Sequence, residues 1–212
     1  MRIGMLGGMF DPVHIGHLRP ALEFHARLAL DELRLVPCAT PGHRETAALP
    51  AEERVALVEA AIADIDGIVV DDRELKLPPP SYTVQTLRDM HAENGEASYI
   101  LGMGEDAFRG FCRWKEWEAI LDLADIVVMH RPGTAEELDP EVATLLESRR
   151  VALEAIGKQV GRIATLEVTP LAVSSTAIRA MLARGEDPKF LVPEAVRQRI
   201  LDNRYYMNGK AG

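Results

Sequence analysis

Short runs of β-branched and other apolar residues alternate along this chain with stretches whose apolar residues recur at helical spacing. The runs predict strands at residues 2–6, 32–37, 68–71, 98–101, 125–130 and 162–168, and the stretches between them predict helices at 18–30, 52–63, 83–91, 114–123, 140–149, 176–183 and 193–203. Nearly continuous apolar strands that alternate with helices are typical of a parallel sheet covered on both faces. The sequence therefore predicts a doubly wound α/β fold, with a mostly parallel sheet and a small helical part at about residues 170–212.

The length and composition suit one globular domain over residues 1–212, because 47% of the residues are hydrophobic and 27% are charged. The opening segment, MRIGMLGGMFDP, predicts a β-strand and not a signal peptide, since Gly-Gly and Asp-Pro cut the apolar run short. No apolar run approaches the roughly 18 residues of a membrane-spanning helix. The two cysteines lack the spacing of a metal site or a disulfide scaffold, so we expect a cytoplasmic protein.

The formal net charge is −9, which disfavours a non-specific nucleic-acid binder or a protein that binds membrane surfaces. The charge is uneven, because residues 176–212 carry seven Lys or Arg and four Asp or Glu, a net charge of +3. This segment is either a solvated helical surface or a local cationic patch for an anionic ligand, and charge alone favours the surface. The sequence leaves open whether the chain forms a homo-oligomer.

The segment GGMFDPVHIGH, residues 7–17, joins the first predicted strand to the first predicted helix. Its two glycines allow the backbone to approach a ligand closely or to adopt a positive φ. The following helix N-terminus offers unpaired N–H groups and a partial positive charge, both of which suit phosphate. His14 and His17 are three residues apart, so on a first helical turn they share one face and could hold phosphate oxygens or stabilise developing charge.

Other interpretations of this segment remain open on the residues alone. A His-x-x-His pair is more often structural or exposed than catalytic. It could also be half of a metal site, although no nearby Glu or third His completes one. The dinucleotide fingerprint GxGxxG is absent, which disfavours a dehydrogenase.

The combination of Gly-Gly, Phe-Asp-Pro and His-x-Gly-His after an N-terminal strand resembles the signature of the nucleotidyltransferases, whose core is (H/T)xGH. Within that superfamily, the segment is similar to GGxFDPVHxGH of the bacterial nicotinate-nucleotide adenylyltransferases. The resemblance implies a Rossmann-like nucleotidyltransferase fold.

Four later segments resemble the same family, and they occur in the family's order. They are PCATPGHR at 37–44, SYTVQTL at 81–87, GED at 104–106 with Trp114 beyond it, and SSTAIR at 174–179. One departure is visible, because Gly42 stands where the family usually has a second proline. It loosens the loop that carries His43 and Arg44, so the pose of these two side chains is less restricted.

The resemblance implies roles for individual residues. His17, His14 and Arg179 are the expected catalytic residues, with His17 contacting the transition state and Arg179 holding the β,γ-phosphates. The expected ATP-binding residues are Gly7, Gly8, Met9, Phe10, His14, Gly16, His17, Gly104, Asp106, Ser175, Thr176 and Arg179. The expected mononucleotide-binding residues are His43, Arg44, Tyr82, Thr83 and Trp114, with Trp114 stacked on the pyridine ring. We assign Trp117, one helical turn later, to the core.

The reaction that the resemblance implies joins ATP and nicotinate mononucleotide to give deamido-NAD and pyrophosphate, in NAD biosynthesis. Mg²⁺ would arrive with ATP, with no dedicated protein site and no tightly bound cofactor. The nearest alternative is an adenylyltransferase for another acceptor, such as nicotinamide mononucleotide or phosphopantetheine. An RNA-charging enzyme is disfavoured by the length, the charge and the lack of a KMSKS-like loop, and a non-catalytic nucleotide sensor by the intact histidines and Arg179.

Overall fold

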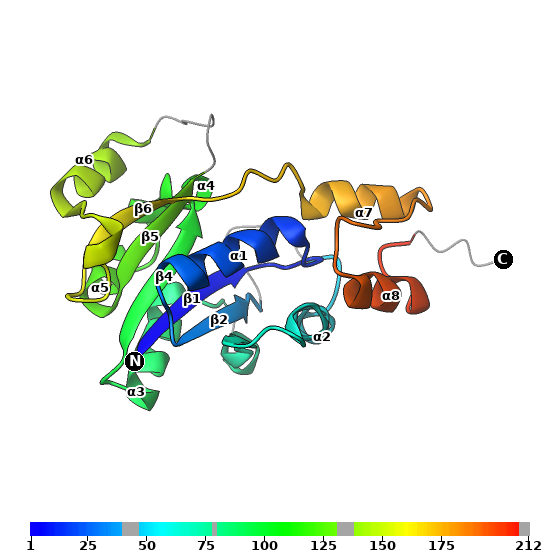
Figure 1. Cartoon of the computed structure of the whole chain (residues 1–212), viewed down its shortest axis with the longest axis horizontal. Coiled ribbons are helices and arrows are strands. Elements are labelled where there is room, and N and C mark those ends of the chain that lie inside the picture. The colour runs from blue at the N-terminus through cyan, green and yellow to red at the C-terminus, as the bar shows by residue number, and fades with distance from the viewer. Residues whose placement is uncertain (40–46, 78–79, 131–137, 208–212) are drawn as a thin grey trace.

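The structure, a computed structural model, describes residues 1–39, 47–77, 80–130 and 138–207 (Figure 1). Its centre is a six-stranded parallel sheet with the strand order β3-β2-β1-β4-β5-β6, which confirms the predicted α/β class. The strands are β1 (Arg2–Gly8), β2 (Glu32–Pro37), β3 (Ile68–Val70), β4 (Ser98–Gly104), β5 (Asp125–His130) and β6 (Ile163–Glu167). The strand order reverses between β1 and β4. In doubly wound sheets, ligands bind outside the carboxyl ends of the strands at such a reversal.

Helices cover both faces of the sheet. The α-helices are α1 (Ile15–Arg27), α2 (Ala51–Ile62), α3 (Thr83–Glu93), α4 (Glu105–Phe108), α5 (Trp117–Leu123), α6 (Pro140–Arg149), α7 (Ser175–Ala183) and α8 (Glu194–Asp202), and short 3₁₀ turns are η1 (Arg73–Lys76), η2 (Phe111–Arg113) and η3 (Leu153–Ala155). Helices α7 and α8 lie together beyond the carboxyl end of β1 (Figure 1). Among the described residues, no helix is long and apolar enough to cross a membrane.

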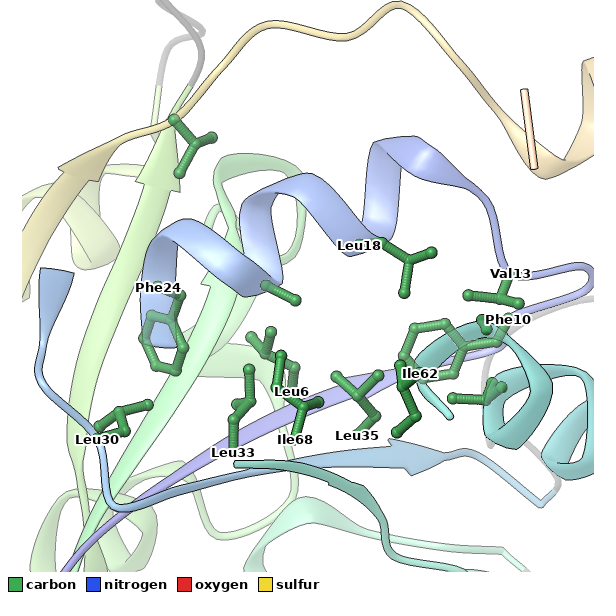
Figure 2. Close-up of a cluster of buried hydrophobic side chains, with 14 of the residues drawn as sticks. Leu6, Phe10, Val13, Leu18, Phe24, Leu30, Leu33, Leu35, Ile62 and Ile68 are labelled. Carbon is green, nitrogen blue, oxygen red and sulfur yellow. The ribbon is translucent and has the colours of Figure 1, made fainter. Parts of the chain in front are cut away.

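The alternation of side chains along β1 divides the core into two layers. Leu6 points into the layer beneath α1 and α2, where it meets Phe24 and Leu33 (Figure 2). Ile3 and Met5 point into the opposite layer, which α3, α5 and α6 cover. Burial of each such side chain stabilises the fold by about 1.5–3 kcal/mol. The two layers fix β1 in the middle of the sheet, so the loop that follows it starts from a rigid support.

Several predicted boundaries were wrong by a few residues. The first helix begins at Ile15 and not at residue 18, because the chain turns helical directly after His14. Strand β4 extends to Gly104, since its last glycine still pairs with Met129 of β5. The helix predicted at 114–123 begins only at Trp117, after the η2 turn and a positive φ of 50° at Glu116.

Candidate active site

A pocket of about 1110 Å³ lies at the carboxyl ends of β1 and β4, where the strand order reverses. Gly7 and Gly8 at the end of β1 and Gly104 at the end of β4 form part of its wall. The starts of α1, α3 and α7 also contribute lining residues. Segments far apart in the sequence therefore meet at the place where folds of this class bind their ligands.

The loop after β1 takes its shape from Phe10 and not from the two glycines. Phe10 has a φ of 47°, whereas neither Gly7 nor Gly8 has a positive φ, so that part of the prediction was wrong. The Phe10 side chain is buried in the core beneath α1 and helps to fix this unusual backbone (Figure 2). Gly7 instead contributes open space, because a Cβ at this position would meet no atom within 4 Å.

The N-terminus of α1 has fewer available N–H groups than the sequence predicts. Ile15 N donates to Leu191 O at 3.0 Å, and His17 N donates to His14 O at 2.8 Å. In this first turn, as far as the structure describes the chain, the N–H of Gly16 is the one that stays available to a ligand. Gly16 lines the pocket. A side chain at Gly16 would place its Cβ only 3.0 Å from the His14 ring and 3.2 Å from Val173 O, so glycine allows this close approach.

The two histidines form a stacked pair, which confirms that they share one face. Their ring centroids are 3.7 Å apart and their planes are inclined by 24°. His14 is only 3% exposed and lies behind His17, which reaches the pocket. The edge of Phe10 supports His17 from another side, with 5.2 Å between ring centroids. The stack fixes the orientation of the His17 imidazole toward the pocket.

The start of α7 forms the neighbouring wall. Ser174 is the N-cap residue, and its Oγ accepts a hydrogen bond from Ala177 N at 3.2 Å. Ser175 Oγ donates to Pro12 O at 3.0 Å, which ties α7 to the loop after β1. Because α7 begins at Ser175 and not at residue 176, Arg179 lies in the second helical turn, whereas the predicted helix start would put it in the first. A helix N-terminus and a guanidinium at one wall together favour a bound phosphate.

The Arg179 guanidinium is held by two hydrogen bonds. Its Nη1 donates to Asp11 O at 2.6 Å, and its Nη2 donates to Thr176 Oγ1 at 3.3 Å. The side chain is 30% exposed at the pocket. An anionic ligand in the pocket could therefore reach the remaining N–H groups of a side chain that is already oriented.

Another part of the pocket wall is aromatic. Trp114 lines the pocket and packs on Phe111, with ring centroids 5.6 Å apart. Trp117 packs on the same Phe111 at 5.9 Å, in the core layer beneath α5, as predicted. Tyr82 takes the N-cap position of α3, so Thr83 is the first helical residue and presents its N–H at a helix N-terminus. This wall can accept a flat ring beside an anionic group.

The pocket brings together most of the residues that the sequence singles out. They are Gly7, Gly8, Met9, Phe10, Gly16, His17, Tyr82, Thr83, Gly104, Asp106, Trp114, Ser175, Thr176 and Arg179. His14 is in contact with this set through its stack on His17. His43, Arg44 and Gly42 lie outside the described residues.

Arg54 is a structural residue of this region that the sequence analysis missed. It is 1% exposed, and its guanidinium donates to Met9 O and Cys38 O at 2.7 Å and to Ala39 O and Leu49 O at 3.3 Å. One side chain of α2 therefore holds the loops that follow β1 and β2. The sequence carries a signal for this role, because Arg54 stands on the buried face of α2 with Leu57, Val58 and Ile62.

Glu74 is a second missed residue. Its carboxyl is 6% exposed at the pocket wall and accepts a hydrogen bond from Thr86 Oγ1 at 2.9 Å. Burial raises the pKa of Glu74 above its usual value, and the Thr86 hydroxyl offsets only part of that rise. The described residues contain no group of three or more His, Cys, Asp or Glu that could hold a metal ion.

Comparisons with known proteins show which family and fold this chain is similar to. Residues 5–181 match the model of the family described as cytidylyltransferase-like. A Pseudomonas fluorescens protein named "Probable nicotinate-nucleotide adenylyltransferase" is 50% identical over 200 residues, 92% of each chain. A protein of the same name from Halorhodospira halophila is 44% identical over 207 residues, 96% of this chain and 94% of that one. The solved Plasmodium falciparum nicotinic acid mononucleotide adenylyltransferase complexed with NaAD shares the fold, with a TM-score of 0.72, 16% identity and 97% coverage of both chains.

Proposed function

This chain belongs to the cytidylyltransferase-like family and to the nicotinate-nucleotide adenylyltransferases, and on that premise we propose that the pocket between β1 and β4 is its active site. The enzyme transfers the adenylyl group of ATP to nicotinate mononucleotide, which yields deamido-NAD and pyrophosphate in NAD biosynthesis. The observation that carries the site assignment is the convergence of His17, Arg179 and Trp114 on one pocket. A pocket of about 1110 Å³ has room for both substrates.

The proposed reaction is a direct in-line displacement. A phosphate oxygen of the mononucleotide attacks the α-phosphorus of ATP, a new P–O bond forms, and the bond to the β-phosphate bridging oxygen breaks as pyrophosphate leaves. No side chain becomes covalently modified, so the protein contributes orientation and stabilisation of charge. His17, held by the stack on His14, contacts the oxygens of the phosphorus that reacts. Arg179, with Ser175 and Thr176 at the start of α7, holds the β,γ-phosphates and then the pyrophosphate.

The acceptor binds against the aromatic wall. Trp114 stacks on the pyridine ring, while the backbone N–H of Thr83, at the start of α3, faces the nicotinate carboxylate. A helix N-terminus favours an acid over an amide at this position, because its partial positive charge attracts a carboxylate. Tyr82, His43 and Arg44 complete the proposed acceptor site. Glycines 7, 8, 16 and 104, with Met9, Phe10 and Asp106, border the proposed ATP site.

Mg²⁺ enters this proposal as a companion of ATP. The described part of the chain offers no cluster of three ligand side chains, so the phosphate oxygens themselves are the proposed ligands of the ion. When bound there, Mg²⁺ neutralises charge that develops on the phosphates. A single domain over residues 1–212 and a cytoplasmic location also belong to the proposal.

A steady-state assay tests this function directly. Purified protein is given ATP and Mg²⁺ with nicotinate mononucleotide, nicotinamide mononucleotide or phosphopantetheine, and pyrophosphate release is followed. We expect kcat/KM to be highest for nicotinate mononucleotide. Faster turnover of another acceptor would overturn the acceptor assignment, and ATP binding without turnover of any acceptor would show a nucleotide sensor.

A further inference from the structure

Asp11, in the loop after β1, connects three distant parts of the chain. Its Oδ1 accepts a hydrogen bond from Tyr206 Oη at 2.7 Å, and its Oδ2 accepts one from Ala48 N at 2.7 Å. Its backbone oxygen accepts the bond from Arg179 Nη1 at 2.6 Å. Asp11 is 4% exposed, so its carboxylate depends on hydrogen bonds from within the protein. Arg179 therefore contacts the backbone of a residue whose carboxylate is occupied elsewhere.

The carboxylate of Asp11 is also a potential competitor for Arg179. Its Oδ2 lies 3.9 Å from Arg179 Nη1, which is the outer limit of an ion pair. A small rotation of the carboxylate would replace this distance with a direct charge-assisted bond, and the guanidinium would then have fewer N–H groups for an anionic ligand. The hydrogen bonds from Tyr206 and Ala48 hold the carboxylate in an orientation that makes no direct hydrogen bond to Arg179.

Tyr206 suits the task of holding Asp11. Its hydroxyl comes from the segment after α8, 195 residues away in the sequence. Burial, and then the bond to Asp11, raise the pKa of Tyr206 well above its usual value, so its hydroxyl remains a donor. The neighbouring Tyr205 bonds instead to Glu53 of α2, and the two rings meet edge-on with centroids 6.5 Å apart. The two bonds anchor this segment over the loop after β1.

We propose that Tyr206 is a positioning residue for adenylyl transfer, which keeps the Asp11 carboxylate off Arg179 and so leaves the guanidinium available to the pyrophosphate portion of ATP. This inference rests on the proposed role of Arg179. Tyr206 touches no substrate and acts only through Asp11. Its loss therefore weakens the grip on phosphates and leaves acceptor binding unchanged.

The variant Tyr206→Phe removes the hydroxyl and keeps the ring. We expect kcat/KM for ATP to fall and the dissociation constant of inorganic pyrophosphate, measured by calorimetry, to rise, each roughly tenfold. The KM for nicotinate mononucleotide should stay within about twofold. Tyr205→Phe is the matched control, because it loses a tyrosine hydroxyl bond in the same segment without touching Asp11. Thermal unfolding of both variants identifies any loss that comes from stability alone.

A double-mutant cycle with Arg179→Met separates positioning from a structural role. If Tyr206 acts through Arg179, Tyr206→Phe has no further effect on pyrophosphate binding once Arg179 is replaced. The inference would be overturned if the two substitutions raised the dissociation constant of pyrophosphate by independent, multiplying factors. It would also be overturned if Tyr205→Phe weakened pyrophosphate binding as much as Tyr206→Phe. Pyrophosphate binding is measured without turnover. A wild-type protein that binds pyrophosphate but does not turn over nicotinate mononucleotide would therefore contradict the proposed function and not this inference.

Discussion

The imidazole of His17 stacks on that of His14, with 3.7 Å between ring centroids. His14 is buried, so it supports His17 from behind, while His17 reaches the pocket. The buried histidine thus orients the one that faces the pocket.

Replacement of His17 by alanine should lower kcat by roughly 10²–10³-fold, the loss typical of one donor in a preorganised site. Binding of ATP should change less, because the proposed phosphate contacts of Arg179 and α7 remain. The measurement is steady-state turnover of ATP and nicotinate mononucleotide. His25→Ala, in the last turn of the same helix, is the control and should keep near-normal turnover. Near-normal turnover of His17→Ala would remove His17 from the mechanism.

Trp114 and Trp117 offer a matched pair, because both pack on Phe111 but only Trp114 is among the residues that line the pocket. Trp114→Ala should raise the KM for nicotinate mononucleotide roughly tenfold or more, since stacking on a flat ring contributes about 1–3 kcal/mol. The KM for ATP should remain nearly constant. Trp117→Ala should lower the free energy of unfolding without a selective rise in the KM for nicotinate mononucleotide. Equal changes in both variants would contradict the assignment of Trp114 to the acceptor.

Arg54→Met should destabilise the fold by roughly 3 kcal/mol, because it leaves several buried carbonyl groups without their donor. The free energy of unfolding in urea measures this loss. Turnover should fall as well, since Arg54 holds Met9 and Cys38 of the two loops beside the pocket. Arg88→Met is the control, because Arg88 makes an exposed pair with Glu116 that contributes less than about 1 kcal/mol. Similar losses in both variants would count against a special role for Arg54.

Glu74 should make stability depend on pH. Because burial raises its pKa in the folded state, the stability gained from the bound proton is full below the ordinary pKa near 4.5 and is lost as the pH rises through the folded value. Glu74→Gln cannot ionise and keeps an oxygen for Thr86. Its free energy of unfolding, relative to wild type, should therefore increase from about pH 4 to about pH 8.

Glu93→Gln should have the opposite pH dependence: its free energy of unfolding, relative to wild type, should decrease as the pH rises. The hydrogen bond from Arg73 holds the pKa of Glu93 below its usual value, so the stability of that pair is present at neutral pH and lost in acid. Urea unfolding across the pH range compares the two variants. Parallel curves for Glu74→Gln and wild type would contradict a raised pKa of Glu74.

The local patterns of the sequence predicted the architecture well. Apolar runs predicted the strands, and the spacing of His14 and His17 predicted that their side chains share one face, because residues three apart on a helix are neighbours. The start of α7 was predicted within one residue, and its N-cap, Ser174, forms a bond within the same helical turn. These features need no knowledge of the rest of the chain.

The contacts that hold the site were not predictable in this way. Asp11 meets Tyr206 and Ala48 across 195 and 37 residues, and Arg54 reaches Met9 across 45. Such contacts depend on how whole helices and strands pack, and they cannot be predicted from the apolar periodicity or the motif spacing of the sequence. A charge on an apolar helix face, as at Arg54, was the available signal.

The bond between Tyr206 and Asp11 also sets an order of events during protein synthesis. At roughly 5–20 residues per second, a ribosome needs about 10–40 s to proceed from His17 to Tyr206. Throughout that time the nascent chain carries both histidines but lacks the hydroxyl that holds Asp11, and α7 and α8 are added only toward its end. The proposed phosphate site is therefore completed late, after the sheet that supports it has been made, and on this proposal a growing chain holds the pyrophosphate portion of ATP more weakly before then.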